Sequence, residues 1–149
     1  MQQSTTPPWD EIRRRASVFP EAAFQFVRES LAHTVKQLHP ESKGKAEVAD
    51  PALADSRHVT GQQLCLGMRD LALKRYGLLA GAVMRQWGVR ETEDFGVMVY
   101  AMIDRGEMRC SERDSFDDFR DVFAFEEVFS PLPVTPAARR SGVAGSRSA

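Results

Sequence analysis

The sequence predicts a mainly α-helical protein of about five helices with a small β-hairpin near its C-terminal end. Three observations support this class. Apolar residues recur every three or four positions in several windows, which is the period of one helix face. Residues that favour helix starts and helix ends flank these windows. A pattern that also fits a strand occurs only after Gly106.

The first two helices are expected at about residues 8–17 and 20–38. Thr6 is a candidate N-cap of the first helix, and the prolines that follow it favour a first helical turn. The second helix has an apolar stripe at spacings of 3, 4, 4 and 3, formed by Phe24, Val27, Leu31, Val35 and Leu38. It should end at His39, since a residue that precedes proline avoids the helical conformation.

The third helix is expected to begin after Thr60 and to end at Gly77. Thr60 and Gln63 have the spacing of a capping box, in which each side chain bonds the backbone N–H of the other residue. The inward stripe comprises Leu64, Met68, Leu71 and Ala72, with Cys65 beside it. Gly77 can adopt the left-handed conformation that ends many helices.

Two more helices are expected at 78–87 and 92–105. Gly88 should end the first of these, and Thr92 is the candidate N-cap of the second. After Gly106 the helical pattern fails. A hairpin pairing 107–110 with 121–125 and a helical turn at 126–129 are predicted there, although the phenylalanines also fit a helix.

The chain is expected to form one folded domain with flanking segments. Residues 1–18 are an N-terminal segment with a short helix, and 19–129 form a single helical domain. Residues 40–56 are rich in Pro, Ala, Lys and Asp without a period, which predicts a flexible insertion. Residues 130–149 are rich in Pro, Gly, Ser and Arg, which predicts a disordered tail.

Composition excludes several classes of function. The net charge of −1 provides no overall field that would attract nucleic acid or anionic lipid. The longest apolar run, LLAGAVM, is far shorter than the ~20 residues that span a bilayer. Two distant cysteines do not form a disulfide framework, and the N-terminus lacks the apolar core of a signal peptide. We therefore expect a soluble, cytoplasmic protein that does not bind membranes.

The order of helices four and five and the hairpin also fits a winged-helix-like arrangement. A recognition helix needs cations or amides on its outer face. Residues 92–105 instead carry three acids and one arginine, and residues 109–130 carry seven acidic and three basic side chains. These two segments would repel phosphate, so a surface of this shape is better suited to contacting a protein.

The sequence contains no convincing catalytic, metal or cofactor motif. His33, His39 and His58 lack the paired spacing of a zinc site. Cys65 lies beside an inward stripe, where a small buried side chain is the usual interpretation. Cys110 has arginines nearby but no histidine to activate it. We therefore predict that the protein is not an enzyme and binds no metal or cofactor.

Two groups of residues remain as candidate sites. Arg57, His58 and Gln62 lie at the positive N-terminus of the third helix, with Arg69 two turns further on, and could hold an anion or an acidic side chain. That acid could also be internal, from residues 114–121. The second group is a candidate basic patch, formed by Lys74, Arg75, Arg85 and Arg90. For this patch a solvated helix face is the alternative.

Five phenylalanines lie among acids near the end of the predicted domain, at 116, 119, 123, 125 and 129. Aromatic side chains often anchor protein interfaces. A domain of this size also needs large apolar side chains for its core, and we favour that interpretation here.

The blocks RHVTGQQL (57–64), RDLALKRYG (69–77), RQWGVRETEDFG (85–96) and DDFRDVFAF (117–125) resemble a family of small uncharacterised bacterial proteins. The resemblance covers roughly residues 19–129. It implies a bacterial, non-secreted domain of unknown function and assigns no activity, cofactor or catalytic residue. The functional hypothesis is a non-enzymatic protein-interaction or adaptor module with an unidentified protein partner. The alternative is a nucleic-acid-associated regulator.

Overall fold

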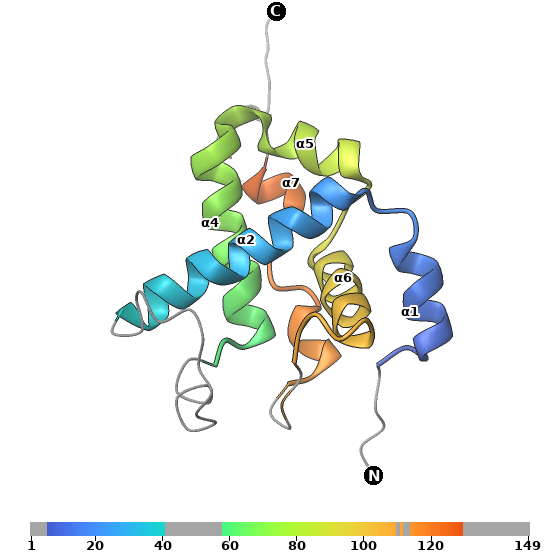
Figure 1. Ribbon diagram of the computed structural model, residues 1–149. Coiled ribbons are helices and arrows are strands. Elements are labelled where there is room, and N and C mark those ends of the chain that lie inside the picture. The colour runs from blue at the N-terminus through green and yellow to red at the C-terminus, as the bar shows by residue number, and fades with distance from the viewer. Residues whose placement is uncertain (1–5, 41–57, 110, 112–113, 130–149) are drawn as a thin grey trace, which may run out of the picture.

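The computed structural model describes residues 6–40, 58–109, 111 and 114–129. This part of the chain is mainly helical, as predicted (Figure 1). Its five longer helices are α1 (Trp9–Ala16), α2 (Glu21–Leu38), α4 (Gly61–Tyr76), α5 (Ala80–Trp87) and α6 (Thr92–Asp104). Shorter elements are the 3-10 helices η2 (Gly77–Leu79) and η3 (Phe116–Phe119) and the single turn α7 (Phe125–Val128). No helix within these ranges is both long and apolar enough to cross a bilayer.

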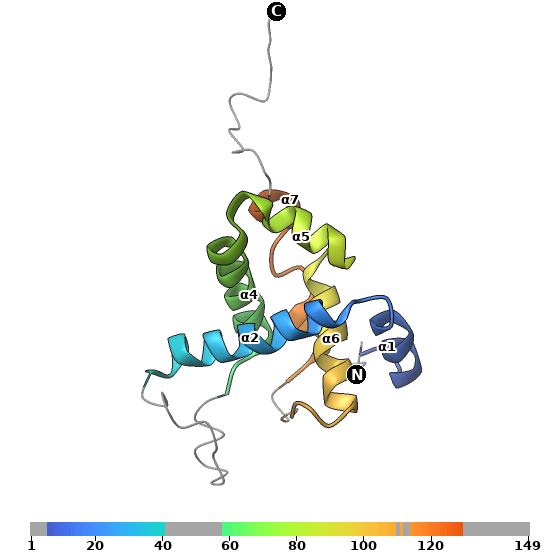
Figure 2. The same ribbon diagram turned by 45° about the horizontal axis from the view of Figure 1, so that its top comes forward.

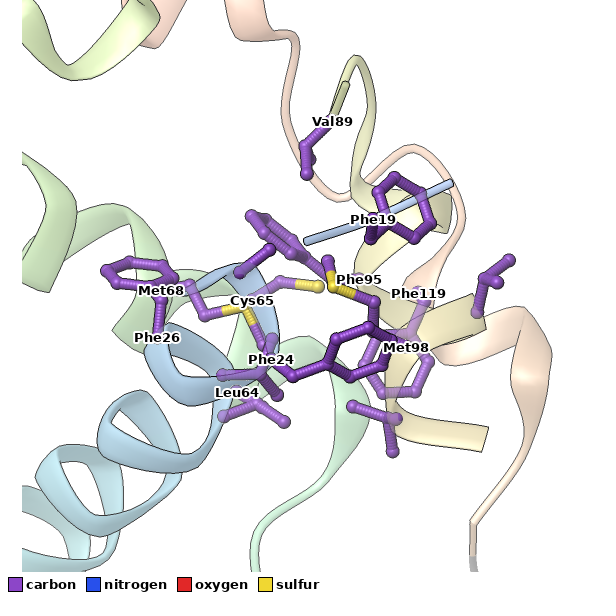
Figure 3. Packing of buried hydrophobic residues seen from close by; sticks show 14 of the residues in the cluster. Phe19, Phe24, Phe26, Leu64, Cys65, Met68, Val89, Phe95, Met98 and Phe119 are labelled. Carbon is purple, nitrogen blue, oxygen red and sulfur yellow. The ribbon is translucent and has the colours of Figure 1, made fainter. Parts of the chain in front are cut away.

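Helix α6 is the central element of the core. It packs against α1, α2, α4 and η3, and every residue from Phe95 to Met102 is buried. Figure 2 shows α2 crossing in front of α6, with α1 and α4 to either side. Side chains from α2, α4, α6 and η3 meet in one cluster, in which Phe26, Met68 and Met98 are almost fully buried (Figure 3). A helix that is apolar on nearly all sides is expected only in such a central position.

Helices α2 and α4 cross closely at Gly67. A Cβ atom at Gly67 would collide with Oγ1 of Thr34, so a glycine is required for this approach. The buried face of α2 consequently includes Ser30 and Thr34. The predicted stripe is correct for Phe24 and Val27, but Leu38 is 41% exposed. The buried face of α2 therefore carries the small side chain of Thr34 at this crossing, whereas the last residue of the predicted stripe, Leu38, lies outside the core.

The helix ends agree with the sequence at α4 and α5. The Gln63 N–H donates to Thr60 Oγ1 at 3.0 Å, and the Thr60 N–H donates to Gln63 Oε1 at 2.9 Å, which confirms the capping box. Gly88 ends α5 in the left-handed conformation, with φ of 83°. Thr6 is not the N-cap of α1, because Pro8 occupies that position without a side-chain cap.

The N-cap of α6 is Glu91 rather than Thr92. Glu91 and Asp94 form a reciprocal capping box, with the Asp94 side chain accepting from the Glu91 N–H at 3.3 Å. Thr92 is instead 1% exposed, and its hydroxyl bonds the backbone of the segment that follows α6. A tertiary contact therefore uses the hydroxyl that the sequence assigned to a cap.

The described residues of 107–129 form no strand, so the predicted hairpin is not confirmed. Phe116 and Phe119 are 0% and 4% exposed and lie three residues apart on the 3-10 helix η3. Asp121 has a φ of 51°, which interrupts extended backbone in the proposed second strand. The helical turn expected at 126–129 is observed at Phe125–Val128. The phenylalanines close the core, as the favoured interpretation predicted.

Some predictions concern residues outside the described ranges. These are residues 41–56 of the expected insertion, the expected tail at 130–149, Arg57, and Cys110 at the end of the first hairpin segment.

Candidate interaction surface

His58 lies against an acid of the same chain. Its Nε2 is 3.2 Å from Oδ1 of Asp114, and the two side chains are 16% and 21% exposed. The ring nitrogen is not aligned for a hydrogen bond, so the contact is an electrostatic pairing when the ring is protonated. The His58 carbonyl also accepts from Nε2 of His39 at 3.0 Å. His58 therefore connects the end of α2, the start of α4 and the acidic segment 114–121. This arrangement corresponds to the alternative in which the acid beside His58 comes from the same chain.

The remaining described residues of the predicted anion site do not converge on His58. Gln62 is exposed, and Arg69 pairs with the neighbouring Asp70 at 3.0 Å. Gln62 and Arg69 are seven residues apart, so they lie on the same side of α4. This side faces solvent, whereas His58 and Asp114 lie against each other.

The solvent side of α4 continues into a group of exposed leucines. Leu66 and Leu73 are 37% and 39% exposed, and they also lie seven residues apart on α4. Leu78 and Leu79, on η2 directly after α4, are 71% and 66% exposed. We refer to these four residues as the leucine surface. Single exposed leucines are ordinary, but a group on one element and its continuation is typical of an interaction site.

The cations near the leucine surface differ in their partners. Arg75 pairs with Glu29 of α2 at 2.6 Å, and Arg69 pairs with Asp70. Glu29 and Asp70 are thereby neutralised. Lys74, next to Leu73 in the chain, is exposed and forms no ion pair with any residue that the structure describes. Lys74 therefore places a positive charge beside the leucine surface that no described acid neutralises.

The predicted basic patch is divided between two places. Lys74 and Arg75 lie near the end of α4, whereas Arg85 and Arg90 line a pocket between α5 and α7. The pocket has a volume of about 320 Å³. Its walls are mostly apolar, and its complete lining is Gly81, Met84, Arg85, Val89, Arg90, Phe125, Glu126 and Phe129.

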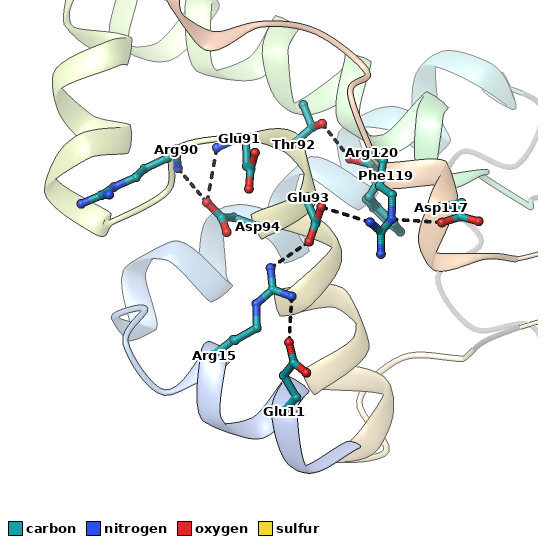
Figure 4. A network of polar contacts seen from close by, with 10 residues as sticks. All are labelled: Glu11, Arg15, Arg90, Glu91, Thr92, Glu93, Asp94, Asp117, Phe119 and Arg120. Carbon is teal, nitrogen blue, oxygen red and sulfur yellow. Dashed lines mark hydrogen bonds and ion pairs between the residues drawn. The ribbon is translucent and has the colours of Figure 1, made fainter. Parts of the chain in front are cut away.

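The acidic start of α6 is bound within the fold (Figure 4). Glu93 pairs with Arg15 of α1 at 3.0 Å and with Arg120 at 3.6 Å, and Arg120 also bonds Asp117 at 3.0 Å. Asp94 accepts from the backbone N–H of Arg90 at 2.8 Å. Burial raises the pKa of Asp94, and the Glu93 carboxylate adds to this effect. The backbone hydrogen bonds from Arg90 and Glu91 and the charge of Arg15 oppose it.

Because the central residues of α6 are buried, this helix has no face that could enter a DNA groove. Among the described residues, exposed cations that could contact nucleic acid are present on α4 and α5. Both the acidic charge of residues 92–105 and the burial of α6 are therefore unfavourable for groove binding.

The buried thiol of Cys65 is poorly suited to nucleophilic chemistry. Cys65 is 0% exposed, and burial together with the nearby Asp118 raises its pKa to about 12. A thiolate is the reactive form of cysteine, so this group is inert at neutral pH. Within the described ranges, no three His, Cys, Asp or Glu side chains are grouped closely enough to hold a metal ion.

Comparison with known proteins found no matching protein-family model, no matching curated protein and no matching solved structure. The candidate surface must therefore be interpreted from its own geometry.

The leucine surface was missed in the sequence, although a signal for it was present. The inward stripe of α4 was assigned to Leu64, Met68, Leu71 and Ala72, and all four are buried. Leu66 and Leu73 fall outside that stripe by the same periodicity. Two leucines that a helix pattern leaves on the polar side could have identified the surface.

Proposed function

We propose that the protein is a non-enzymatic protein-interaction module that binds a partner through the leucine surface. The observation that carries the proposal is the group of four exposed leucines, Leu66, Leu73, Leu78 and Leu79. Burying such side chains against a partner contributes about 25 cal/mol per Å² of apolar area. Lys74, which pairs with no acid of the described residues, selects the kind of partner, an apolar segment that carries acidic side chains.

The proposal is tested by placing a photo-crosslinking amino acid at Leu73 in the native host. Ala32 is the control position, because it is an exposed residue of a long helix outside the leucine surface. An identified adduct from position 73, absent from position 32, supports the proposal. Equal capture at both positions, or no adduct at position 73, contradicts it. An adduct with a second copy of this chain would replace the foreign partner with self-association.

Binding of the identified partner is then measured with purified proteins. A Leu73→Asp, Leu78→Asp variant should bind at least about tenfold more weakly, because it places two charges in the contact. An Ala32→Asp variant adds one charge elsewhere and should bind like the wild type. A thermal melt of each variant separates loss of binding from loss of folding.

The second candidate function is a nucleic-acid-associated regulator. The winged-helix-like arrangement considered in the sequence analysis is part of this second proposal. It is favoured by Lys74, Arg85 and Arg90, which are exposed and pair with no acid of the described residues. Fluorescence anisotropy with a labelled duplex provides the test. The alternative predicts binding that weakens steeply as salt rises and that is reduced in a Lys74→Gln, Arg85→Gln variant. Absence of binding at low salt would remove it.

The cytoplasmic setting and the relationship to a bacterial family belong to the same proposal. They are supported by the cysteine usage and by the four sequence blocks, respectively. Fractionation of the native host, followed by detection of the protein in the cytosolic fraction, tests the setting.

A further inference from the structure

We propose that the pocket between α5 and α7 binds a small apolar carboxylic acid, a function separate from partner docking on the leucine surface. The pocket volume of about 320 Å³ is at the lower end of the range for small-molecule sites. A ligand of this size would be a single ring or a short alkyl chain that bears one carboxylate.

The apolar part of the ligand is specified by the pocket walls. Met84 and Val89 come from α5 and the turn after it, and Phe125 and Phe129 come from α7 and the residue after it. The two phenylalanine rings meet edge to face, with centroids 5.0 Å apart. The contact between these rings fixes a rigid aromatic wall, which binds an apolar ring or chain with little loss of entropy.

A close backbone contact holds the two sides of the pocket together. A Cβ atom at Gly81 would collide with the carbonyl oxygen of Phe129, so α5 and the end of α7 can approach only at a glycine. Gly81 and Phe129 are both buried, so this side of the pocket belongs to the folded core. The pocket is therefore a fixed feature of the fold.

The carboxylate is specified by two arginines that line the same pocket. Neither the Arg85 nor the Arg90 side chain pairs with a carboxylate of the described residues. In Figure 4 the guanidinium of Arg90 lies away from Asp94, whose carboxylate is bonded to backbone N–H groups. A guanidinium matches a carboxylate in shape and can donate two parallel hydrogen bonds.

The acids near the pocket do not neutralise this charge. Glu126 lines the pocket but forms no ion pair with Arg85 or Arg90, which leaves two cations and one acid in the lining. Glu91, next to Arg90 in the chain, is directed to the capping box of α6. The expected tail at 130–149 carries three arginines and no Asp or Glu, so its side chains offer no carboxylate either.

The inference is tested with 3-phenylpropionate, a ring that bears one carboxylate, added to the ¹⁵N-labelled full chain. Chemical-shift changes should be largest at the amides of Gly81, Gly88 and Val89. The matched probe is 3-phenylpropionamide, which has the same body and no charge. It should bind at least about threefold more weakly, because an exposed charge-assisted contact is lost.

Substitutions with opposite expected effects identify the charged groups. Arg85→Gln and Arg90→Gln should each weaken binding of the acid by about threefold to tenfold and leave the amide unaffected. Glu126→Gln should strengthen binding of the acid, since it removes a like charge. Lys74→Gln is the control, because Lys74 is exposed and lies outside the pocket lining. All four side chains are exposed, so the fold should be preserved.

Three results would overturn the inference. The first is the absence of shifts around the pocket at millimolar probe. The second is equal binding of the acid and the amide, and the third is an equal effect of the Lys74 and Arg85 substitutions. None of these results depends on partner docking, so failure here and failure of the proposed interaction function are distinguishable.

Discussion

The hydroxyl of Thr92 donates to the carbonyl oxygen of Phe119 across 2.6 Å, and this bond attaches the segment after α6 to the first turn of that helix. The Thr92 hydroxyl oxygen in turn accepts from the Val122 N–H at 3.2 Å. One turn further along α6, a Cβ atom at Gly96 would lie 2.8 Å from the Phe119 side chain. The hydroxyl of Thr92 and the absence of a side chain at Gly96 together position the Phe119 ring.

Replacing Thr92 by valine should therefore destabilise the protein by about 1–3 kcal/mol. The substitution keeps the shape of the side chain but leaves the Phe119 carbonyl and the Val122 N–H without a partner in a buried setting. Urea unfolding followed by circular dichroism measures the change in the free energy of unfolding. Thr92→Ser is the control, because it retains the hydroxyl and loses one methyl group, a cost of about 1 kcal/mol. A valine variant as stable as the serine variant would contradict this role.

The close crossing of α2 and α4 predicts a coupled pair of substitutions. Gly67→Ala should destabilise the protein by about 1–3 kcal/mol, because the new methyl group collides with the Thr34 hydroxyl and forces the helices apart. In a Thr34→Ala background that oxygen is absent, and the same glycine substitution should cost less. A double-mutant cycle measures this coupling.

Additive effects in that cycle would show that the two residues do not limit the approach of the helices. Gly88→Ala provides a separate comparison, because a Cβ atom at Gly88 meets nothing within 4 Å. Its cost should come from the positive φ of 83° alone and should not depend on the residue at position 34.

These two contacts also indicate how far the sequence could predict the fold. Hydrophobic period and capping signals predicted the five longer helices, with boundaries within one or two residues for α4. They could not predict that Thr34 meets Gly67 or that Thr92 meets Phe119, because these partners are 33 and 27 residues apart. Contacts of this kind depend on the tertiary arrangement, and they determined which threonines act as caps.

The candidate site was predicted less well than the fold. The basic residues Arg85 and Arg90 were named from the sequence, but their shared pocket depends on α7 folding back onto α5. Phe125 and Phe129 were expected in the core, and they also form a wall of that pocket. The period could not separate a hairpin from short helical turns in this region, so the pocket could not be anticipated.

The partly buried carboxylate of Asp94 predicts a pH dependence of stability. Burial raises its pKa in the folded state, so the protonated form is favoured there relative to the unfolded chain. Its stabilising effect is therefore complete below the ordinary aspartate pKa of about 3.9 and is lost as pH rises through the raised value. Asp94→Asn should remove this contribution, because asparagine keeps an oxygen acceptor for the cap and carries no charge.

The measurement is the free energy of unfolding of both proteins from pH 3 to 8. Other acids contribute in the opposite direction. For example, the pKa of Glu29 is lowered by the side chains of Gln25 and Arg75. The relevant quantity is therefore the free energy of unfolding of the wild type minus that of Asp94→Asn, and this difference should fall as pH rises. A difference that is constant with pH, or that rises with pH, would contradict the raised pKa of Asp94.

The thiol of Cys65 should react only when the protein unfolds. At pH 8 a pKa of about 12 leaves roughly one thiol in 10⁴ ionised, about a thousandfold less than for an ordinary cysteine. The side chain is also 0% exposed, so a reagent cannot reach it in the folded state.

A Cys110→Ser variant leaves Cys65 as the only cysteine, and its reaction with a chromogenic disulfide is followed with and without urea. The control places a cysteine at the exposed Gln62 in a chain without the other two, where the reaction should proceed at the rate of a free thiol. If Cys65 reacted as fast as the Gln62→Cys control without urea, the closed packing of α4 against η3 around this thiol would be wrong. If its rate instead rises with urea in step with global unfolding, the α4–η3 contact opens only with the whole core.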